Sequence, residues 1–292
     1  MQAEQQKTHA IAQQRAHLPL WQTMILAGLL IWLYAPTLDH LVRQWWHDPN
    51  FSHGFFVPLF SAFVIWQERS QLTGLRLRPS WWGLLLLGSG LCLLIVGQMG
   101  AELFLSRLSL LIVLAGLIVL FLGWNFFRAL FFPWAFLLLM IPIPAIIFNQ
   151  ITFPLQLLAS KVACTVLPWM GVPVLCEGNV LHLPHIDLEV AEACSGIRSL
   201  MSLTTLALIY GYLMERRNAV RVLLGVASIP IAVAANSVRI VGTGMLAEYW
   251  NPDKARGFFH EFSGWLIFMV SLVMLYLLHR LVRIFWPDGG ES

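Results

Sequence analysis

The stretch WWGLLLLGSGLCLLIVGQM, residues 81–99, contains no charged side chain. A helix of this length crosses the hydrocarbon core of a bilayer, which takes about 20 apolar residues. Runs of similar character recur along the chain, in which 58% of residues are hydrophobic and only 11% are charged. Soluble domains average about 25% charged residues. The sequence therefore predicts an integral membrane protein and excludes a water-soluble fold.

We predict an all-α polytopic membrane protein with about eight transmembrane helices. Residues 150–169 are apolar but contain Gln156, Lys161 and two prolines, so we expect an interfacial or re-entrant helix there. Residues 171–190 alternate apolar and polar positions around Gly178-Asn179, a pattern typical of a small hairpin. The predicted spans are residues 20–38, 52–67, 81–99, 103–122, 125–146, 196–214, 220–246 and 262–281.

The placement of Lys and Arg predicts the orientation, because cytoplasmic loops carry an excess of these residues. With a cytoplasmic N-terminus, eleven basic residues fall on the inner side and three on the outer side. The bias holds only if 150–169 does not cross the membrane. We therefore expect both termini in the cytoplasm and residues 150–195 at the outer face. The inner residues are Lys7, Arg15, Arg69, Arg76, Arg78, Arg128, Arg216, Arg217, Arg221, Arg280 and Arg283, and the outer residues are Arg43, Lys254 and Arg256.

The domain organisation is expected to be simple. We predict a membrane-embedded domain over 20–286 between cytoplasmic tails at 1–19 and 287–292. The polar N-terminal stretch and the first apolar run lack a small-x-small cleavage site, so we expect a retained span and no signal peptide. No internal repeat is visible, whereas many transporters are built from repeated halves. No basic run resembles a nucleic-acid patch, and the lipid bilayer is the expected surrounding.

The four cysteines form no metal-binding motif. Cys92 lies in the middle of a span, where a thiol behaves as a small hydrophobe. Cys164, Cys176 and Cys194 are expected near one face, and their spacing permits a disulfide without requiring one. We expect no cofactor and no metal.

The segment AEACSGIRSL, residues 191–200, lies where the hairpin meets a membrane helix. Cys194 and Arg198 are four residues apart, so they share a helix face. A helix start and a guanidinium both favour the thiolate, which is the reactive form. Ser195 lacks a G-x-S-x-G context and is expected to cap the helix or donate a hydrogen bond. The alternative for Cys194 is a buried structural thiol.

Arg239 falls inside a predicted span and has apolar residues on both sides. Inserting an arginine at the centre of a span costs about 2.5–3.5 kcal/mol, so we expect it to face a partner or a water-filled cavity. Asn236 lies three residues earlier on the same face. The alternative is a structural ion pair, for which the spans offer few carboxylates.

His260 opens the last predicted span at the outer face. Its segment is not a zinc-protease helix, because H-E-x-x-H requires a second histidine where Gly264 stands. His53 also begins a span from the outside and is a weaker candidate. The alternative for His260 is an interfacial histidine bonded to headgroups or backbone.

Cys194, Arg239 and His260 come from three helices, and the charge rule alone places all three at the outer face. The set is typical of acyl transfer. A thiolate attacks a peptide carbonyl, a histidine protonates the leaving amine, and an arginine stabilises the oxyanion.

These residues resemble the exosortase/archaeosortase family of membrane-embedded transpeptidases. By position, Cys194 matches the family's nucleophile, Arg239 its essential arginine and His260 its histidine. The resemblance covers roughly residues 34–283. It rests on EACSGIRS at 192–199, NSVRI at 236–240 and HEFSG at 260–264, with FSHGFFVP at 51–58 and the pieces GVPV and EGN within 171–179.

The resemblance implies a cysteine protease or transpeptidase of the bacterial inner membrane that acts at its outer face. Its expected partners are exported, membrane-anchored proteins with a C-terminal sorting signal. That signal consists of a short motif (Pro-Glu-Pro in the bacterial branch, hence PEP-CTERM), a membrane helix and a basic tail. The bacterial members are associated with exopolysaccharide and biofilm production. Some members carry a further soluble C-terminal domain, whereas this sequence ends at Ser292.

Two other functions remain as alternatives. In the first alternative the chain is a non-enzymatic subunit for exopolysaccharide export or assembly. In the second it holds a zinc ion through Cys176, His182 and His185. The residues leave open whether the acceptor is water, an amine or a lipid, and whether Arg198 or Arg239 holds the oxyanion. They also leave open the subfamily with its exact sorting motif, and the oligomeric state.

Overall fold

The computed structural model describes residues 20–190, 197–249 and 258–286. Helices make up 82% of the structure, which confirms the predicted all-α polytopic class. The chain separates into two compact units. One contains Met1–Asp48 and Gly54–Pro142, and the other contains Pro49–His53 and Ile143–Ser292.

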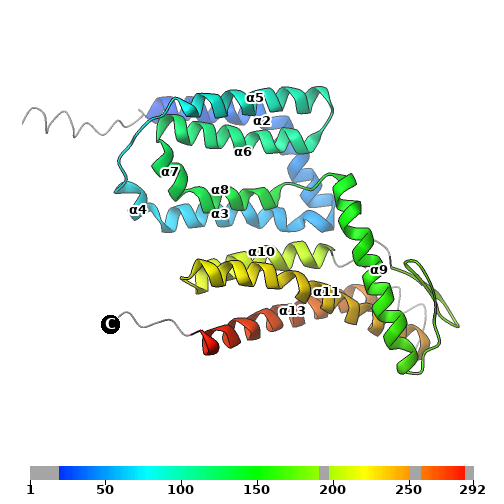
Figure 1. Cartoon of the computed structure of the whole chain (residues 1–292). Helices are drawn as coiled ribbons and strands as arrows, with labels where there is room; N and C mark the ends of the chain where they lie inside the picture. The colour runs from blue at the N-terminus through cyan, green and yellow to red at the C-terminus, as the bar shows by residue number, and fades with distance from the viewer. Residues whose placement is uncertain (1–19, 191–196, 250–257, 287–292) are drawn as a thin grey trace, which may run out of the picture. The chain divides into compact units, whose positions relative to one another are not determined.

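The first unit is helical throughout its described part. Helices α2, α5 and α6 pack together, and α3 packs on α8 and the 3-10 turn η2 (Figure 1). Tyr34 of α2 shares a buried hydrogen bond with Ser109 of α6, at 3.0 Å between their oxygens. The elements are α2 (Leu20–His47), α3 (Phe56–Gln67), α4 (Arg69–Thr73), α5 (Trp82–Met99), α6 (Leu103–Phe121), α7 (Trp124–Ala129), α8 (Phe131–Phe136) and η2 (Leu137–Met140).

Glycines bring α5 and α6 into backbone contact. Gly83, Gly90 and Gly97 recur every seven residues of α5 and face α6. A β-carbon added to Gly83 would lie only 2.2 Å from the backbone nitrogen of Leu120. In a lipid bilayer the hydrophobic effect does not drive helices together, because lipid tails are as apolar as the side chains. Small residues instead let the two backbones approach closely, and van der Waals packing stabilises the pair.

The predicted span over 125–146 is wrong as a single helix. The structure instead contains α7, α8 and η2, with a break at Leu130. Pro133 has no N–H to bond the carbonyl four residues earlier, so the helix is interrupted in the preceding turn. Pro142 and Pro144 then separate η2 from the next helix. The broken run is held at Pro133, whose carbonyl accepts a hydrogen bond from Ser61 of α3.

The second unit combines three long helices with a small sheet and a further helix. The residues Pro49–His53 of the 3-10 turn η1 (Pro49–Phe55) also belong to it. Its central helix α11 contacts α9, α10 and α13. The elements are α9 (Ala145–Trp169), β1 (Leu175–Glu177), β2 (Val180–His182), β3 (Asp187–Glu189), α10 (Ile197–Met214), α11 (Asn218–Tyr249) and α13 (Phe258–Phe285).

The sheet confirms the predicted hairpin and adds a third strand. β1 and β2 pair antiparallel around Gly178, whose φ of 62° suits a residue without a side chain. β3 pairs antiparallel on the other edge of β2. A disulfide joins Cys164 of α9 to Cys176 of β1. We call β1, β2, β3 and this disulfide the cap.

Seven helices in the described part of the chain are long and apolar enough to cross a membrane, namely α2, α5, α6, α9, α10, α11 and α13. Helix α9 lies steeply across α11 and does not run alongside it (Figure 1). The expectation of an interfacial or re-entrant helix over 150–169 stays a prediction, because α9 is also long and apolar enough to cross. Of the other predicted crossings, 52–67 contains α3, of 12 residues, and 125–146 contains the shorter apolar segment Phe131–Met140.

Candidate functional site

The end of the second unit that carries the cap is where the described part of the site lies. Val190 follows β3 and is 1% exposed, and Ile197 begins α10 and is also 1% exposed. Cys194 and Ser195 lie between them, outside the described residues, so the predicted sharing of a helix face between Cys194 and Arg198 stays a prediction. Arg198 is exposed in the first turn of α10.

Arg239 lies two-thirds of the way along α11 and packs against α13. A β-carbon added to Gly264 would lie 3.4 Å from both Cζ and Nη2 of Arg239. The guanidinium therefore rests on bare helix backbone at a position where most side chains would displace it. Asn236 is 4% exposed, one turn earlier on α11. The prediction that Arg239 faces protein and not lipid is supported by this contact.

His260 lies in the first turn of α13, four residues before Gly264. Positions four residues apart share a face of a helix. Position 260 is therefore on the face of α13 that meets Arg239, one turn farther toward the N-terminus of the helix. The imidazole itself lies outside the described side chains.

A small pocket separates β3 from α11. It is lined by Leu188, Glu189 and Val190 from the sheet side and by Arg239, Ile240 and Thr243 from α11. Thr243 donates a hydrogen bond to the carbonyl of Arg239, at 2.9 Å. Val190, which lines this pocket together with Arg239, precedes Cys194 by four residues in the sequence.

The cap is held to the C-terminal end of α11 by polar contacts. His185 lies 3.1 Å from Glu248 through Nδ1 and Oε2. Tyr249 donates a hydrogen bond to the carbonyl of Met170, at 2.9 Å. Beneath these contacts Val190, Ile240, Leu181 and Ala163 belong to one buried apolar cluster. The cap therefore holds the strand that leads to residues 191–196 against the helix that carries Arg239.

The disulfide overturns the zinc alternative as it was drawn. Cys176 is bonded to Cys164 and has no thiolate to offer a metal. His182 and His185 each lie beside a carboxylate, Asp187 and Glu248 respectively. Among the described residues no group of three side chains suited to a metal is present.

His53 is buried in η1, where its ring lies 6.5 Å from that of Phe51. Phe51 in turn packs on Phe148 of α9. The next residue, Gly54, is closely packed, since a β-carbon there would lie 2.3 Å from Nε1 of Trp45. His53 is thus placed with the second unit, and its role in the site stays a prediction.

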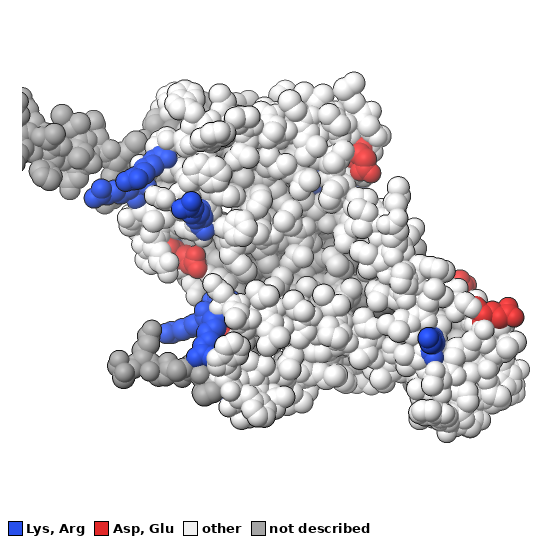
Figure 2. Space-filling view, viewed as in Figure 1, with Lys and Arg blue, Asp and Glu red and all other residues white. Residues whose placement is uncertain are grey.

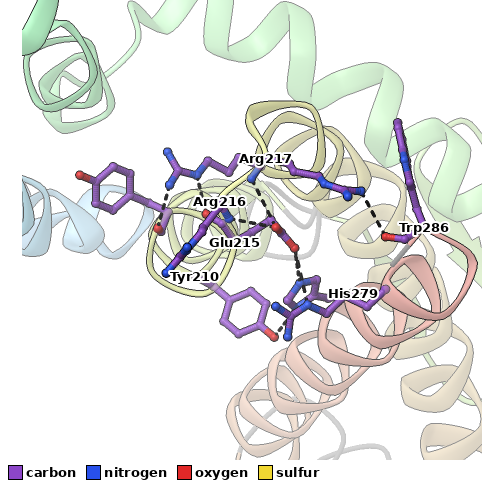
Figure 3. Close-up of polar contacts among 9 residues, drawn as sticks. Tyr210, Glu215, Arg216, Arg217, His279 and Trp286 are labelled. Atoms are coloured by element: carbon purple, nitrogen blue, oxygen red, sulfur yellow. Dashed lines mark hydrogen bonds and ion pairs between the residues drawn. The ribbon is translucent and has the colours of Figure 1, made fainter. Parts of the chain in front are cut away.

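A second polar cluster was missed by sequence reasoning (Figure 3). Glu215, in the turn between α10 and α11, is 3% exposed and lies 3.2 Å from His279 of α13. Burial alone would raise the pKa of Glu215, but hydrogen bonds from His279 and from the backbone N–H groups of Arg217 and Arg216, with the charge of Arg283, hold it below the ordinary value. The sequence does contain a signal for this cluster, namely a histidine inside an apolar span and a glutamate next to two arginines.

Residues 45–277 match the transmembrane exosortase family. The chain belongs to the exosortase family. The match takes in every described element of the site, from η1 through Gly264. No curated protein and no solved structure matches the chain. The family assignment therefore rests on the sequence match.

Proposed function

We propose that this exosortase is a membrane-embedded cysteine protease or transpeptidase in which Cys194, Arg239 and His260 carry the reaction. One observation supports this most directly. The guanidinium of Arg239 rests on Gly264, on the face of α13 that carries position 260. Arg239 thus contacts α13 at a residue one turn from position 260, and in the sequence β3 precedes Cys194.

The proposed reaction has two halves. The thiolate of Cys194 attacks the carbonyl carbon of the scissile peptide bond, and the carbonyl oxygen becomes an oxyanion beside Arg239. The oxyanion collapses, the C–N bond breaks and His260 gives a proton to the leaving amine, which leaves a thioester on Cys194. An acceptor then attacks the thioester, loses its proton to His260 and releases the thiolate. Water as acceptor gives a carboxylic acid, and an amine gives a new amide.

The proposed substrates are exported proteins with a C-terminal sorting signal of the PEP-CTERM type, cut at the outer face of the inner membrane. The disulfide in the cap supports this side, because disulfides persist in oxidising compartments outside the cytoplasm. Figure 2 shows Lys and Arg gathered around the α10–α11 turn and the end of α13, while Asp and Glu lie over the cap. This agrees with the positive-inside rule for the second unit.

Mass spectrometry of the intact protein tests the proposal. Co-expression with a sorting-signal substrate should give an adduct on Cys194 with the mass of the substrate fragment as a thioester. Hydroxylamine should remove it. The Cys194→Ala variant should form no adduct and should leave the substrate uncut, whereas Cys92→Ala, a matched change at an exposed cysteine, should process normally. Normal processing by Cys194→Ala would refute the proposal and favour the exopolysaccharide-export alternative.

A further inference from the structure

A hydrogen-bonded network of buried and half-buried polar groups joins α10, the α10–α11 turn and α13. One carboxylate oxygen of Glu215 accepts hydrogen bonds from the backbone N–H groups of Arg216 and Arg217, at 2.9 and 3.3 Å. The other lies 3.2 Å from Nε2 of His279. Nδ1 of His279 lies 2.7 Å from the hydroxyl of Tyr210 on α10 (Figure 3).

The chemistry of these groups gives the hydrogen bonds of this network one direction. A neutral imidazole has one N–H donor and one acceptor nitrogen. Donation from Nε2 to the carboxylate leaves Nδ1 to accept the proton of the Tyr210 hydroxyl. Glu215 and His279 are each about 3% exposed, so neither can exchange its partner for water without opening the bundle. Arg283 adds a weaker contact, with Nε 3.7 Å from the same oxygen.

The apolar packing beside this network is less specific. Leu203, Leu224, Ala232 and Leu275 form a buried aliphatic cluster between the same three helices. Aliphatic ridges and grooves repeat along a helix, so a sliding helix finds new partners of similar energy. A buried polar pair does not, because a shifted helix leaves a carboxylate without its donor.

The register of α13 matters at the other end of the helix. Gly264 is fifteen residues from His279, about 22 Å along the axis. A slip by one residue would move position 260 by about 1.5 Å and turn it away from Arg239, and a slip by one turn would move it about 5.4 Å. A misplacement of about 1 Å can cost about 100-fold in rate.

We propose that Glu215, His279 and Tyr210 are positioning residues that fix the axial register of α13 against α10 and α11, and so hold position 260 beside Arg239. The catalytic part of this inference rests on the proposed function, whereas the register itself does not. These three residues touch neither substrate nor reacting atoms and act only through the helices they join.

Disulfide trapping measures the register without any activity. In a Cys92→Ala, Cys194→Ala background, Ala232→Cys on α11 is combined with Phe268→Cys or Leu272→Cys, which lie one turn apart on α13 in the same apolar cluster. A disulfide needs Cα atoms within about 7 Å, so a shift of one turn, about 5.4 Å, changes which pair forms. One pair should dominate in the otherwise unaltered chain. Glu215→Ala or His279→Phe should move the preference to the other pair or spread it over both.

Kinetics then connect the register to the site. With Cys194 present, Glu215→Ala and His279→Phe should lower kcat by about 100-fold per titrated thiol while KM changes little. Glu215→Gln, which keeps an acceptor for His279, should recover much of the loss. Arg280→Lys is the matched control, because Arg280 is an exposed neighbour of His279 that makes none of these contacts, and lysine keeps the charge that acts on Tyr210.

Each outcome decides one point. An unchanged trapping pattern in Glu215→Ala and His279→Phe overturns the inference, whatever the activity. A changed pattern with full activity overturns the catalytic role of the register. A loss that appears as fewer titratable thiols, with kcat per thiol unchanged, shows a folding role alone and also overturns it. Failure of the proposed function is seen separately, as normal processing by Cys194→Ala.

Discussion

The guanidinium of Arg239 lies against Gly264, with only 3.4 Å between its Cζ and the position of a β-carbon at residue 264. That distance is ordinary contact for a single methyl group and leaves no room for a longer side chain. The glycine thus permits an arginine from α11 to lie flat on α13 at a depth where a guanidinium facing lipid would be costly.

Substitutions at Gly264 should therefore separate by size. If Arg239 stabilises the oxyanion as proposed, Gly264→Ala should keep most of the processing activity, whereas Gly264→Leu should lower it by about 100-fold because it displaces the guanidinium. Processing of a sorting-signal substrate at equal protein levels measures both. Gly242→Leu is the control, because a β-carbon at Gly242 on α11 meets no atom within 4 Å. Equal activity in the two Gly264 variants would argue against the role of Arg239.

Removal of the cap disulfide should destabilise the second unit. The bond joins residues twelve apart, and closing a loop of about this length is worth about 3 kcal/mol. We expect the Cys164→Ala, Cys176→Ala double variant to unfold at a lower temperature in detergent. The free Cys92, changed to Ala, should leave the midpoint unaltered. If the wild-type protein bound a thiol reagent at Cys164 before reduction, the disulfide itself would be refuted.

The close contact of α5 with α6 at Gly83, Gly90 and Gly97 predicts that two glycines of α5 differ in their effect on stability. Gly83→Ala places a methyl group 2.2 Å from the backbone of Leu120, so α5 and α6 must separate and stability should fall. Gly88→Ala meets no atom within 4 Å and should be neutral or slightly stabilising, because alanine favours helix by about 1 kcal/mol over glycine. Thermal midpoints of both variants in the same detergent test this. A similar thermal midpoint for both variants would mean that the close α5–α6 contact does not contribute to stability.

The stabilising effect of Glu215 should depend on pH. Its pKa lies below the ordinary 4.5 in the folded protein, so its contribution to stability is present above pH 4.5. The contribution is lost as the pH falls from 4.5 through the lower folded value, because the folded state must then take up a proton that the unfolded state already holds. The carboxylate is faced by His279 and Arg283 of α13 and by the backbone N–H groups of Arg216 and Arg217, while Tyr210 contacts His279 on its other side.

The measurement is the difference in unfolding midpoint between the wild-type protein and Glu215→Gln. It should be greatest near pH 7 and shrink below pH 4.5. Taking the difference removes the titration of groups common to both proteins. A difference that stays constant down to pH 3 would contradict the assignment.

The local features of this fold could be read from the sequence. Five predicted spans coincide closely with α5, α6, α10, α11 and α13. Length and apolar content decide a membrane helix, since every backbone group of the span is bonded within it. The turn at Gly178 could also be predicted, because a positive φ favours glycine. The candidate site residues were chosen by chemical type, by their positions in the predicted spans and by the family resemblance of the segments that contain them.

What only the tertiary structure decided are the pairings between distant residues. Arg239 needs Gly264 across a helix contact, and Glu215 finds His279 at a separation of 64 residues. Cys164 bonds Cys176 although no spacing required it, and α9 lies across α11 although its length would let it span. A local pattern specifies which groups must be satisfied. It does not say by which partner, because that choice follows from how the helices pack.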